Sequence, residues 1–180
     1  MDPANRYFTR FGYYMLRAEY FFGATVSTVL LVRAGAKGEH VDWVGAAILF
    51  AYPDTIGYLP GAIAYRRAKD KRIPLWYAYT YNVLHSPFTA AAVGAVYWWL
   101  HGADWALLAI PLHLFGDRSV FGNIYKMPKV RFEPEAPHPA WARVEDDVER
   151  PWWELEDSAA GVEETPAPSK PARSEPVGAR

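Results

Sequence analysis

The sequence contains no cysteine. The chain therefore has no disulfide, no zinc site built on thiolates and no cysteine nucleophile. Its net charge is only −1 over 180 residues, an average that conceals two unlike parts. Disorder is excluded for the chain as a whole, because hydrophobic residues make up 51% of it and aromatic residues 16%. A chain of this length is long enough for one domain with an appendage.

The composition changes after residue 127. Residues 1–127 hold 12 Lys and Arg against 8 Asp and Glu, whereas residues 128–180 hold 7 against 12. All 12 Tyr lie in the first part, and 9 of the 15 Pro lie in the second. A segment so rich in proline and acid buries too little apolar surface to offset its ordering entropy. We therefore expect a domain over 1–127 and a largely disordered, acidic, Pro-rich tail over 128–180. Its tryptophans are either stray aromatics or a short motif for a partner or a lipid surface.

Four long apolar stretches fill the first part of the chain. Each approaches or exceeds the roughly 20 residues with which a helix crosses a bilayer. Polar residues occur singly in them instead of forming the stripe of a surface helix, and no stretch alternates as a strand does. The sequence thus predicts an all-α fold, a four-helix transmembrane bundle, against the alternative of a soluble bundle with unusually apolar helices. The stretches are Ala18–Val32, Val41–Leu59, Trp76–Leu100 and Ala103–Gly122.

Lys and Arg alternate between the segments that flank these stretches. In chain order the five segments carry 3, 2, 5, 0 and 3 of them. This is the positive-inside pattern of four spans with both termini in the cytoplasm, and tryptophans at the ends of the stretches fit an aromatic belt. Arginines interrupt the first apolar run, which argues against a cleavable signal peptide. We expect a multi-pass protein of the plasma membrane that contacts the lipid bilayer and has no nucleic-acid partner.

Ionisable residues gather at one depth of the predicted bundle. Asp54, His85, His113 and Asp117 fall ~7–14 Å below the cytoplasmic boundary at ~1.5 Å per residue, and Glu19 joins the shallow end of this layer. An Asp in hydrocarbon costs roughly 2.5–3.5 kcal/mol, so such residues usually face the bundle interior. Five of them in one layer, contributed by all four stretches, indicate a site.

The residue types in this layer suit a metal ion. His113 and Asp117 form H-x-x-x-D and share one face of a helix. With His85 and Asp54 they make two imidazoles and two carboxylates, a set that suits Zn, Mn or Fe(II) and can leave a position open for water. Water bound to such an ion can ionise near neutral pH, which makes hydrolysis the natural reaction class. Glu19 is the candidate general base.

Other roles stay open for the same residues. Tyr81 or Asn82 could supply the base or could contact the ligands. Asp117 could pair with Arg118 near the interface, and the two histidines could donate to carbonyls that nearby prolines leave unpaired. A haem held between the two histidines is a further alternative, which the adjacent carboxylates make less attractive.

Three short motifs carry a resemblance. In the order PD…GY, YN-x-x-H and H-x-x-x-DR…G…K they resemble an uncharacterised family of small four-span bacterial membrane proteins. More distantly, the order PD, HS and H-x-x-x-D is similar to the membrane-bound metal-dependent hydrolases. The resemblance covers about 41–127 and implies the same four residues as metal ligands. The motifs are PDTIGY (Pro53–Tyr58), YNVLHS (Tyr81–Ser86) and LHLFGDR (Leu112–Arg118) with Gly122 and Lys126.

Two functional hypotheses follow, and the sequence does not decide whether the chain is an enzyme. The first is a membrane-embedded metal site near the cytoplasmic leaflet that supports hydrolysis. The alternative is a non-enzymatic membrane scaffold whose cytoplasmic tail recruits a protein partner. A transporter is less favoured, because four spans would have to oligomerise to form inverted repeats.

Overall fold

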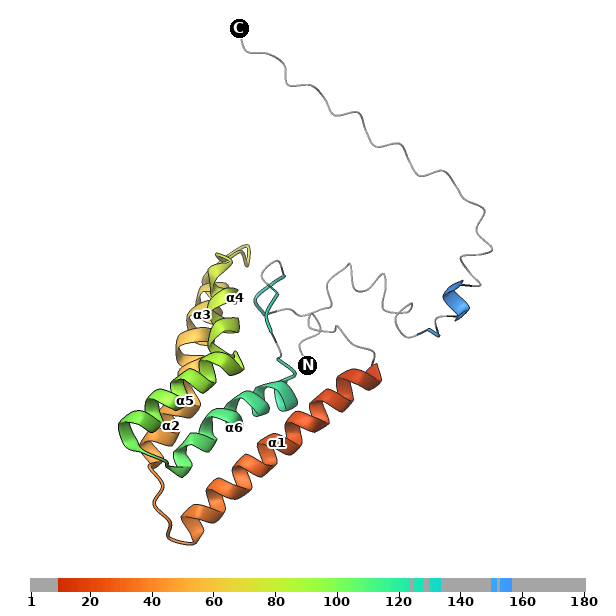
Figure 1. Cartoon of the computed structure of the whole chain (residues 1–180). Helices are drawn as coiled ribbons and strands as arrows, with labels where there is room; N and C mark the ends of the chain where they lie inside the picture. Colours follow the sequence, from red (N-terminus) through yellow and green to blue (C-terminus); the bar gives the residue numbers. More distant parts are fainter. Residues whose placement is uncertain (1–9, 124, 128–129, 134–149, 152, 157–180) are drawn as a thin grey trace, which may run out of the picture.

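The computed structural model describes residues 10–123, 125–127, 130–133, 150–151 and 153–156. Within these residues the fold is all-α and contains no strand, as the sequence predicts. The α-helices are α1 (Arg10–Ala36), α2 (Trp43–Tyr52), α3 (Leu59–Arg67), α4 (Trp76–Leu84), α5 (Pro87–His101) and α6 (Ala109–Gly116) (Figure 1). The π-helical segments η2 (Pro53–Tyr58) and η4 (Asp117–Phe121) and the 3-10 helix η3 (Trp105–Leu108) complete the helical elements, with a short helical turn at 153–156.

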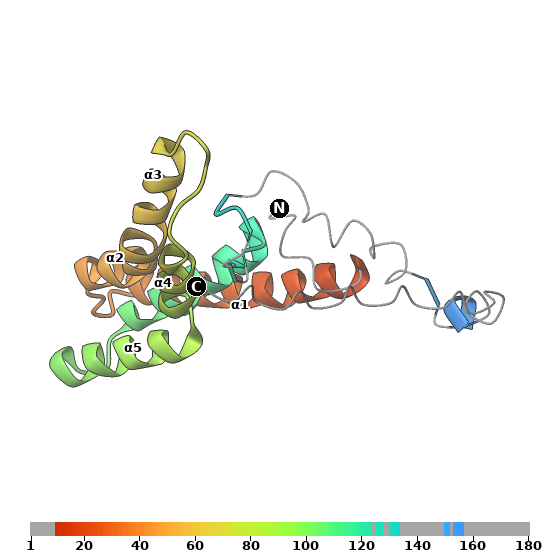
Figure 2. The ribbon, with the colours of Figure 1, turned by 90° about the horizontal axis from the view of Figure 1, so that it is seen from above.

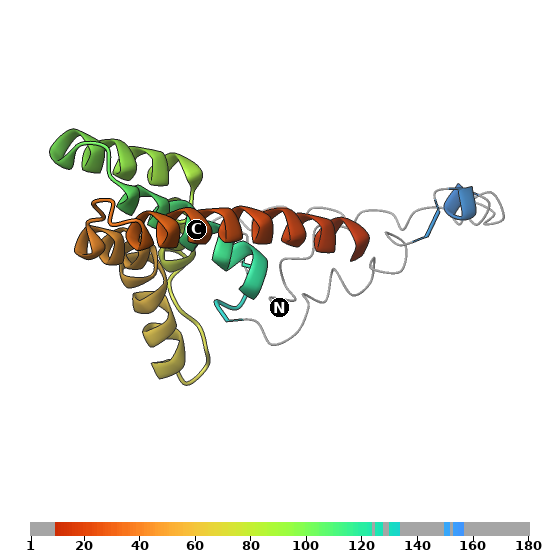
Figure 3. The ribbon, with the colours of Figure 1, turned by 90° about the horizontal axis from the view of Figure 1, so that it is seen from below.

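The longest helix, α1, runs along one side of the other helices (Figures 2 and 3). It packs against α6 and η4 through a narrow buried stripe that includes Ala24, Ser27 and Leu31. Much of the rest of its surface is exposed and apolar, with Phe22 70% accessible. Of the described residues, one helix, Phe11–Ala36, is long and apolar enough to cross a membrane. The other three apolar stretches are divided into shorter elements.

The second stretch forms a continuous but irregular helical rod, α2–η2–α3. Asp42 begins it by accepting a hydrogen bond of 2.8 Å from the Gly45 N–H. Pro53 has no N–H to donate, and the chain widens there into the π-helical turn of η2. The rod continues to Arg67, well beyond the predicted end at Leu59.

The third stretch is not one helix, and the predicted continuous span over Trp76–Leu100 is wrong. His85 ends α4, and Ser86 then adopts an extended backbone with ψ 138° and caps α5 through its side chain. Pro87 follows as the first residue of α5. The chain breaks here because proline disfavours a helical conformation at the residue before it and is itself favoured at a helix start.

The fourth stretch supplies the centre of the fold. Helix α6 contacts α1, α2 and α5, while η4 continues it toward α1. Gly122 ends η4 with φ +73°, a left-handed conformation that glycine adopts without a Cβ clash. The main apolar core lies where α2, α5 and α6 meet. Its buried residues are Ala46, Leu49, Ala90, Tyr97, Ala106, Ala109, Ile110 and Leu114.

Residues 130–133, which we call the docked segment, lie against the helical body. Phe132 is 5% exposed and packs beside Tyr58 and Tyr81. An added Cβ on Gly61 would overlap the Phe132 ring, so the missing side chain makes this close approach possible. Most of the predicted tail, including Trp141 and Trp152, lies outside the described residues. The domain boundary and the disorder of the tail therefore stay predictions.

Candidate metal centre

The structure brings four predicted ligands together from three of the apolar stretches. Asp54 lies in η2, His85 ends α4, His113 lies in α6 and Asp117 begins η4. One ligand atom from each of the four lies within 4.8 Å of the others. Residues separated by up to 63 positions in the sequence thus converge on one point.

The distances within this cluster lie at or beyond the long end of the hydrogen-bond range. His85 Nε2 lies 3.4 Å from Asp54 Oδ1 and 3.4 Å from Asp117 Oδ2. His113 Nε2 lies 4.0 Å from Asp54 Oδ1. An N–H···O bond is usually about 2.7–3.2 Å long, whereas ligands ~2.1 Å from a tetrahedral ion are ~3.4 Å apart. The spacing is therefore compatible with ligands arranged around a shared ion.

The hydrogen bond made by His85 determines which of its ring nitrogens faces the carboxylates. Its Nδ1 lies 2.9 Å from the carbonyl oxygen of Tyr81, which can only accept a hydrogen bond. Nδ1 therefore carries a hydrogen. Nε2, on the other side of the ring, faces carboxylate oxygens of Asp54 and Asp117, an arrangement that needs a proton or a cation between them.

Both histidines are buried with ring nitrogens that lack hydrogen bonds. His85 is 2% exposed and His113 is 4% exposed. Within the described residues, His85 Nε2 and both ring nitrogens of His113 have no hydrogen-bond partner. Buried polar atoms are nearly always paired in native proteins, and an unpaired one indicates a missing water or ion. Three such atoms beside two carboxylates form a group that could hold a metal ion.

Tyr81 holds two members of the cluster. Its ring stacks on His85 with 3.9 Å between the ring centroids, and its hydroxyl lies 3.2 Å from Asp117 Oδ2, to which it donates. Through its carbonyl it also orients His85. A partner that fixes the orientation of a ligand in this way usually strengthens metal binding. Of the roles that the sequence left open for Tyr81, contact with the candidate ligands is the one that the structure shows.

Arg118 braces the cluster from the α1 side. Its guanidinium donates to the His85 carbonyl oxygen at 3.3 Å and to the Tyr20 hydroxyl at 3.3 Å. The break after α4 exposes that carbonyl, because no following helical turn pairs with it. The alternative in which Asp117 pairs with Arg118 does not appear among the ion pairs of the described residues, since adjacent positions on a helix point in different directions.

Lys126 is a buried cation that sequence reasoning missed. It is 7% exposed, its ammonium donates to the Phe132 carbonyl at 2.6 Å, and it lies 5.0 Å from the Tyr81 ring centroid. Asn82 holds it in place through two hydrogen bonds with its backbone, of 2.8 and 2.7 Å. A count of loop charges treats this lysine as solvated. Its place in the H-x-x-x-DR…G…K motif is the only signal in the sequence.

Glu133 ties the docked segment to the body. Its carboxylate accepts hydrogen bonds from the Tyr58 hydroxyl at 2.6 Å and from Arg66 at 3.1 Å. Burial raises the pKa of Glu133, but the hydrogen bond from Tyr58 and the charge of Arg66 outweigh it, so the pKa lies below the ordinary value of 4.5. The hydrogen bond with Glu133 and the negative charge of that residue raise the pKa of Arg66.

Glu19 is not part of the cluster. Its side chain is exposed on α1, and α1 contributes Tyr20 and Arg17 instead, the latter donating to the Ser119 carbonyl at 2.6 Å. Its role as a general base stays a prediction. A haem between His85 and His113 would have to occupy the space in which the carboxylates lie.

The chain matches no family model, no curated protein and no solved structure. The resemblance to small four-span membrane proteins and to membrane-bound hydrolases therefore stays a prediction as well.

Proposed function

We propose that the protein is a multi-pass membrane protein that binds a divalent metal ion at Asp54, His85, His113 and Asp117 and uses it for hydrolysis. The observation that carries the proposal is the set of buried, unpaired imidazole nitrogens that face carboxylate oxygens. Two imidazoles and two carboxylates suit Zn, Mn or Fe(II). An ion held there supplies Lewis acidity and lowers the pKa of a bound water.

The residues around the ligands have separate roles in this proposal. Tyr81 orients the His85 ring and donates to the Asp117 carboxylate, which keeps the lone pairs of both directed at one point. Arg118 holds the end of α4 against α1 through the His85 carbonyl. Because these contacts come from packed helices, the geometry exists before the ion binds, and little ordering free energy is lost on binding.

Several observations support the membrane environment. Helix α1 is long and apolar enough to span a bilayer. Large apolar side chains are exposed on the other helices too, including Phe88 at 87% and Trp99 at 82%. Exposed apolar surface on this scale marks a lipid or protein contact. On α1, Thr25 and Thr28 donate to carbonyls one turn back, a bond that satisfies a hydroxyl in apolar surroundings. Together with the charge pattern, these features favour four spans in the plasma membrane.

Metal analysis of the intact protein tests the proposal. Protein purified in detergent without chelator should hold about one divalent ion per chain, and His85→Ala/His113→Ala should hold almost none. His101→Ala is the matched control, because His101 stacks on Tyr97 at the far end of α5 and is exposed. Wild-type protein without stoichiometric metal would overturn the metal site. It would favour the alternative of a scaffold whose tail recruits a partner.

Hydrolysis is tested separately on metal-loaded protein. A panel of chromogenic phosphate and carboxylate esters should be cleaved by wild-type protein and not by Asp117→Asn. Metal binding without any cleavage would leave the site intact and reject the hydrolytic role. The two parts of the proposal therefore fail independently.

A further inference from the structure

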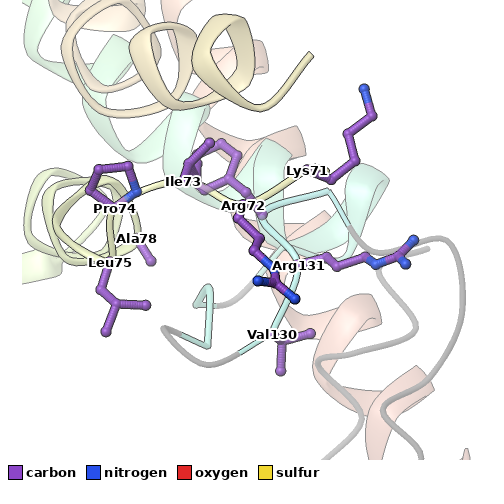
Figure 4. A pocket seen from close by; sticks show the side chains of 9 residues that line it. Lys71, Arg72, Ile73, Pro74, Leu75, Ala78, Val130 and Arg131 are labelled. Carbon is purple, nitrogen blue, oxygen red and sulfur yellow. The ribbon is translucent and has the colours of Figure 1, made fainter. Parts of the chain in front are cut away.

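A pocket with a basic rim lies between the α3–α4 loop and the docked segment. Its volume is about 240 Å³. Residues far apart in the sequence form it, since 71–75 and Ala78 line one side and 130–132 the other (Figure 4). The floor is apolar and the rim is cationic. The floor consists of Ile73, Pro74, Leu75, Ala78, Val130 and Phe132, and the rim of Lys71, Arg72 and Arg131.

The charges around the pocket do not cancel. Residues 66–72 carry five cations and one acid, Asp70. Asp70 lies 3.8 Å from Arg72, and with side chains 62% and 89% exposed the two form a weak pair. The acid of the docked segment, Glu133, is already paired with Arg66. The pocket is therefore electropositive, with Arg72 and Arg131 as its principal cations.

Of the three rim cations, Arg72 is the one whose guanidinium is turned toward the pocket, whereas the Arg131 side chain extends away from Val130 in Figure 4. Lys71 donates to the Arg66 carbonyl at 3.2 Å and lies over the Tyr65 ring, and in Figure 4 it extends away from the floor. The guanidinium of Arg72 instead points toward Val130. Guanidinium groups recognise phosphate through paired hydrogen bonds better than ammonium groups do.

We propose that this pocket binds the headgroup of an anionic glycerophospholipid. The arginines suit the phosphate, and the apolar floor suits the glycerol and the first acyl carbons. Leu75 and Trp76, at the start of α4, are about half exposed and continue the apolar surface toward the bilayer. Basic pockets between membrane helices on the cytoplasmic side commonly bind such lipids. The inference rests on the proposed membrane location and not on the metal site.

The lipid would also connect to the candidate metal centre. Phe132 forms part of the pocket floor and packs against Tyr81, whose hydroxyl donates to Asp117. A headgroup held by Arg131 therefore holds the docked segment in place beside the residue that orients the ligands. The Phe132 ring thus links lipid binding to the position of Tyr81.

Native mass spectrometry of the full chain in detergent tests the proposal, with dioleoyl phosphatidylglycerol and dioleoyl phosphatidylcholine as probes. Wild-type protein should retain phosphatidylglycerol in preference to phosphatidylcholine. Arg72→Gln/Arg131→Gln should bind phosphatidylglycerol roughly 30-fold more weakly, at about 1 kcal/mol per cation. The matched control is Arg33→Gln/Lys37→Gln, which removes two cations from the loop after α1 and should bind like wild type.

A second variant tests the pocket without a change of charge. Val130→Trp fills the floor, and it should also weaken phosphatidylglycerol binding while it leaves every cation in place. The proposal would be overturned in favour of unspecific attraction if wild-type protein bound both lipids equally well. The same conclusion would follow if the control variant lost as much phosphatidylglycerol binding as Arg72→Gln/Arg131→Gln. Displacement by inorganic phosphate at the concentration of the lipid would assign the site to free phosphate instead. Full binding by both pocket variants would show that the lipid binds elsewhere.

Discussion

The Tyr81 hydroxyl donates to Asp117 Oδ2 over 3.2 Å, and the same oxygen lies 3.4 Å from His85 Nε2. One carboxylate oxygen thus lies between a hydroxyl donor from α4 and the Nε2 atom of His85. Tyr81 satisfies only part of the charge on that oxygen, which also faces the other members of the cluster. This relationship makes Tyr81 and Asp117 the most informative pair to change.

Tyr81→Phe should weaken metal binding about tenfold, because it removes a hydrogen bond to a ligand and leaves the stacked ring in place. Competition with a chromophoric chelator measures the affinity. Tyr79→Phe is the matched control, since Tyr79 is 55% exposed on the same helix. Identical affinities for both variants would mean that the hydroxyl has no part in metal binding.

A chelator should lower the melting temperature of the wild-type protein, because a ligand that binds only the folded state stabilises it. Asp117→Asn should lose this response. The amide keeps the size of the carboxylate and a hydrogen bond, so a purely structural network would lose only about 1 kcal/mol, whereas a neutral amide is a much poorer metal ligand. Thermal unfolding with and without chelator distinguishes the two. A chelator response that survives in Asp117→Asn would exclude Asp117 as a ligand.

Two glycine substitutions should have opposite effects on stability. Gly61→Ala should destabilise the protein and release the docked segment, because the new methyl group overlaps the Phe132 ring. Gly116→Ala meets no atom within 4 Å, so it should gain about 0.5–1 kcal/mol from the better helix propensity of alanine. Thermal unfolding of both variants checks this contrast. A stabilising Gly61→Ala would show that Phe132 does not pack there.

The docked segment should detach in acid. A carboxylate whose pKa is lowered in the folded state stabilises that state above its ordinary pKa and loses this contribution as the pH falls through the lowered value. For Glu133 the window therefore begins near pH 4.5 and extends below it. The chain has no cysteine, so a dye on Val130→Cys reports the segment alone. The same dye on Val130→Cys/Glu133→Gln should show no such transition, and an identical transition there would assign it to other groups.

The orientation in the membrane is tested with a reporter that is active only outside the cytoplasm. Inserted at Gly102, between α5 and η3, it should be active, and fused after Arg180 it should be silent. The prediction follows from the absence of Lys and Arg in the loop at Gly102 and their abundance in the flanking segments. Activity at the C-terminal fusion, or silence at Gly102, would reverse the topology.

The four members of the cluster could be predicted because the predicted topology assigns each residue a depth in the bundle. Depth gives the height of a residue along the helix axis but not the side on which it lies. His113 and Asp117 are buried and meet the half-exposed Asp54, whereas Glu19, at a similar predicted height, is exposed on α1. Because α1 has almost no polar stripe, its sequence does not indicate which of its faces is turned toward the other helices.

The break after His85 had a local signal that the apolar composition outweighed. Ser86 followed by Pro87 is a helix cap followed by the residue best tolerated at a helix start. In a stretch of 25 mostly apolar residues these two were interpreted as features within one span.

Lys126 was missed for a different reason. Its burial depends on Phe132 and Tyr81, a contact between distant parts of the chain that no local pattern encodes.

The break between α4 and α5 also bears on how the protein is made. Helix α4 has 9 residues, ~14 Å at ~1.5 Å per residue, which is about half of a bilayer core. Under the proposed membrane location, neither half of the third stretch is long enough to insert as a span of its own, and we expect the two halves to enter the membrane as a unit. Asp54 and His85 leave the ribosome well before His113 and Asp117, so a nascent chain carries half of the candidate metal cluster until residue 117 is synthesised. Under the proposed metal binding, we expect the ion to be taken up only after that point, and a chain truncated after α5 to be unable to retain it.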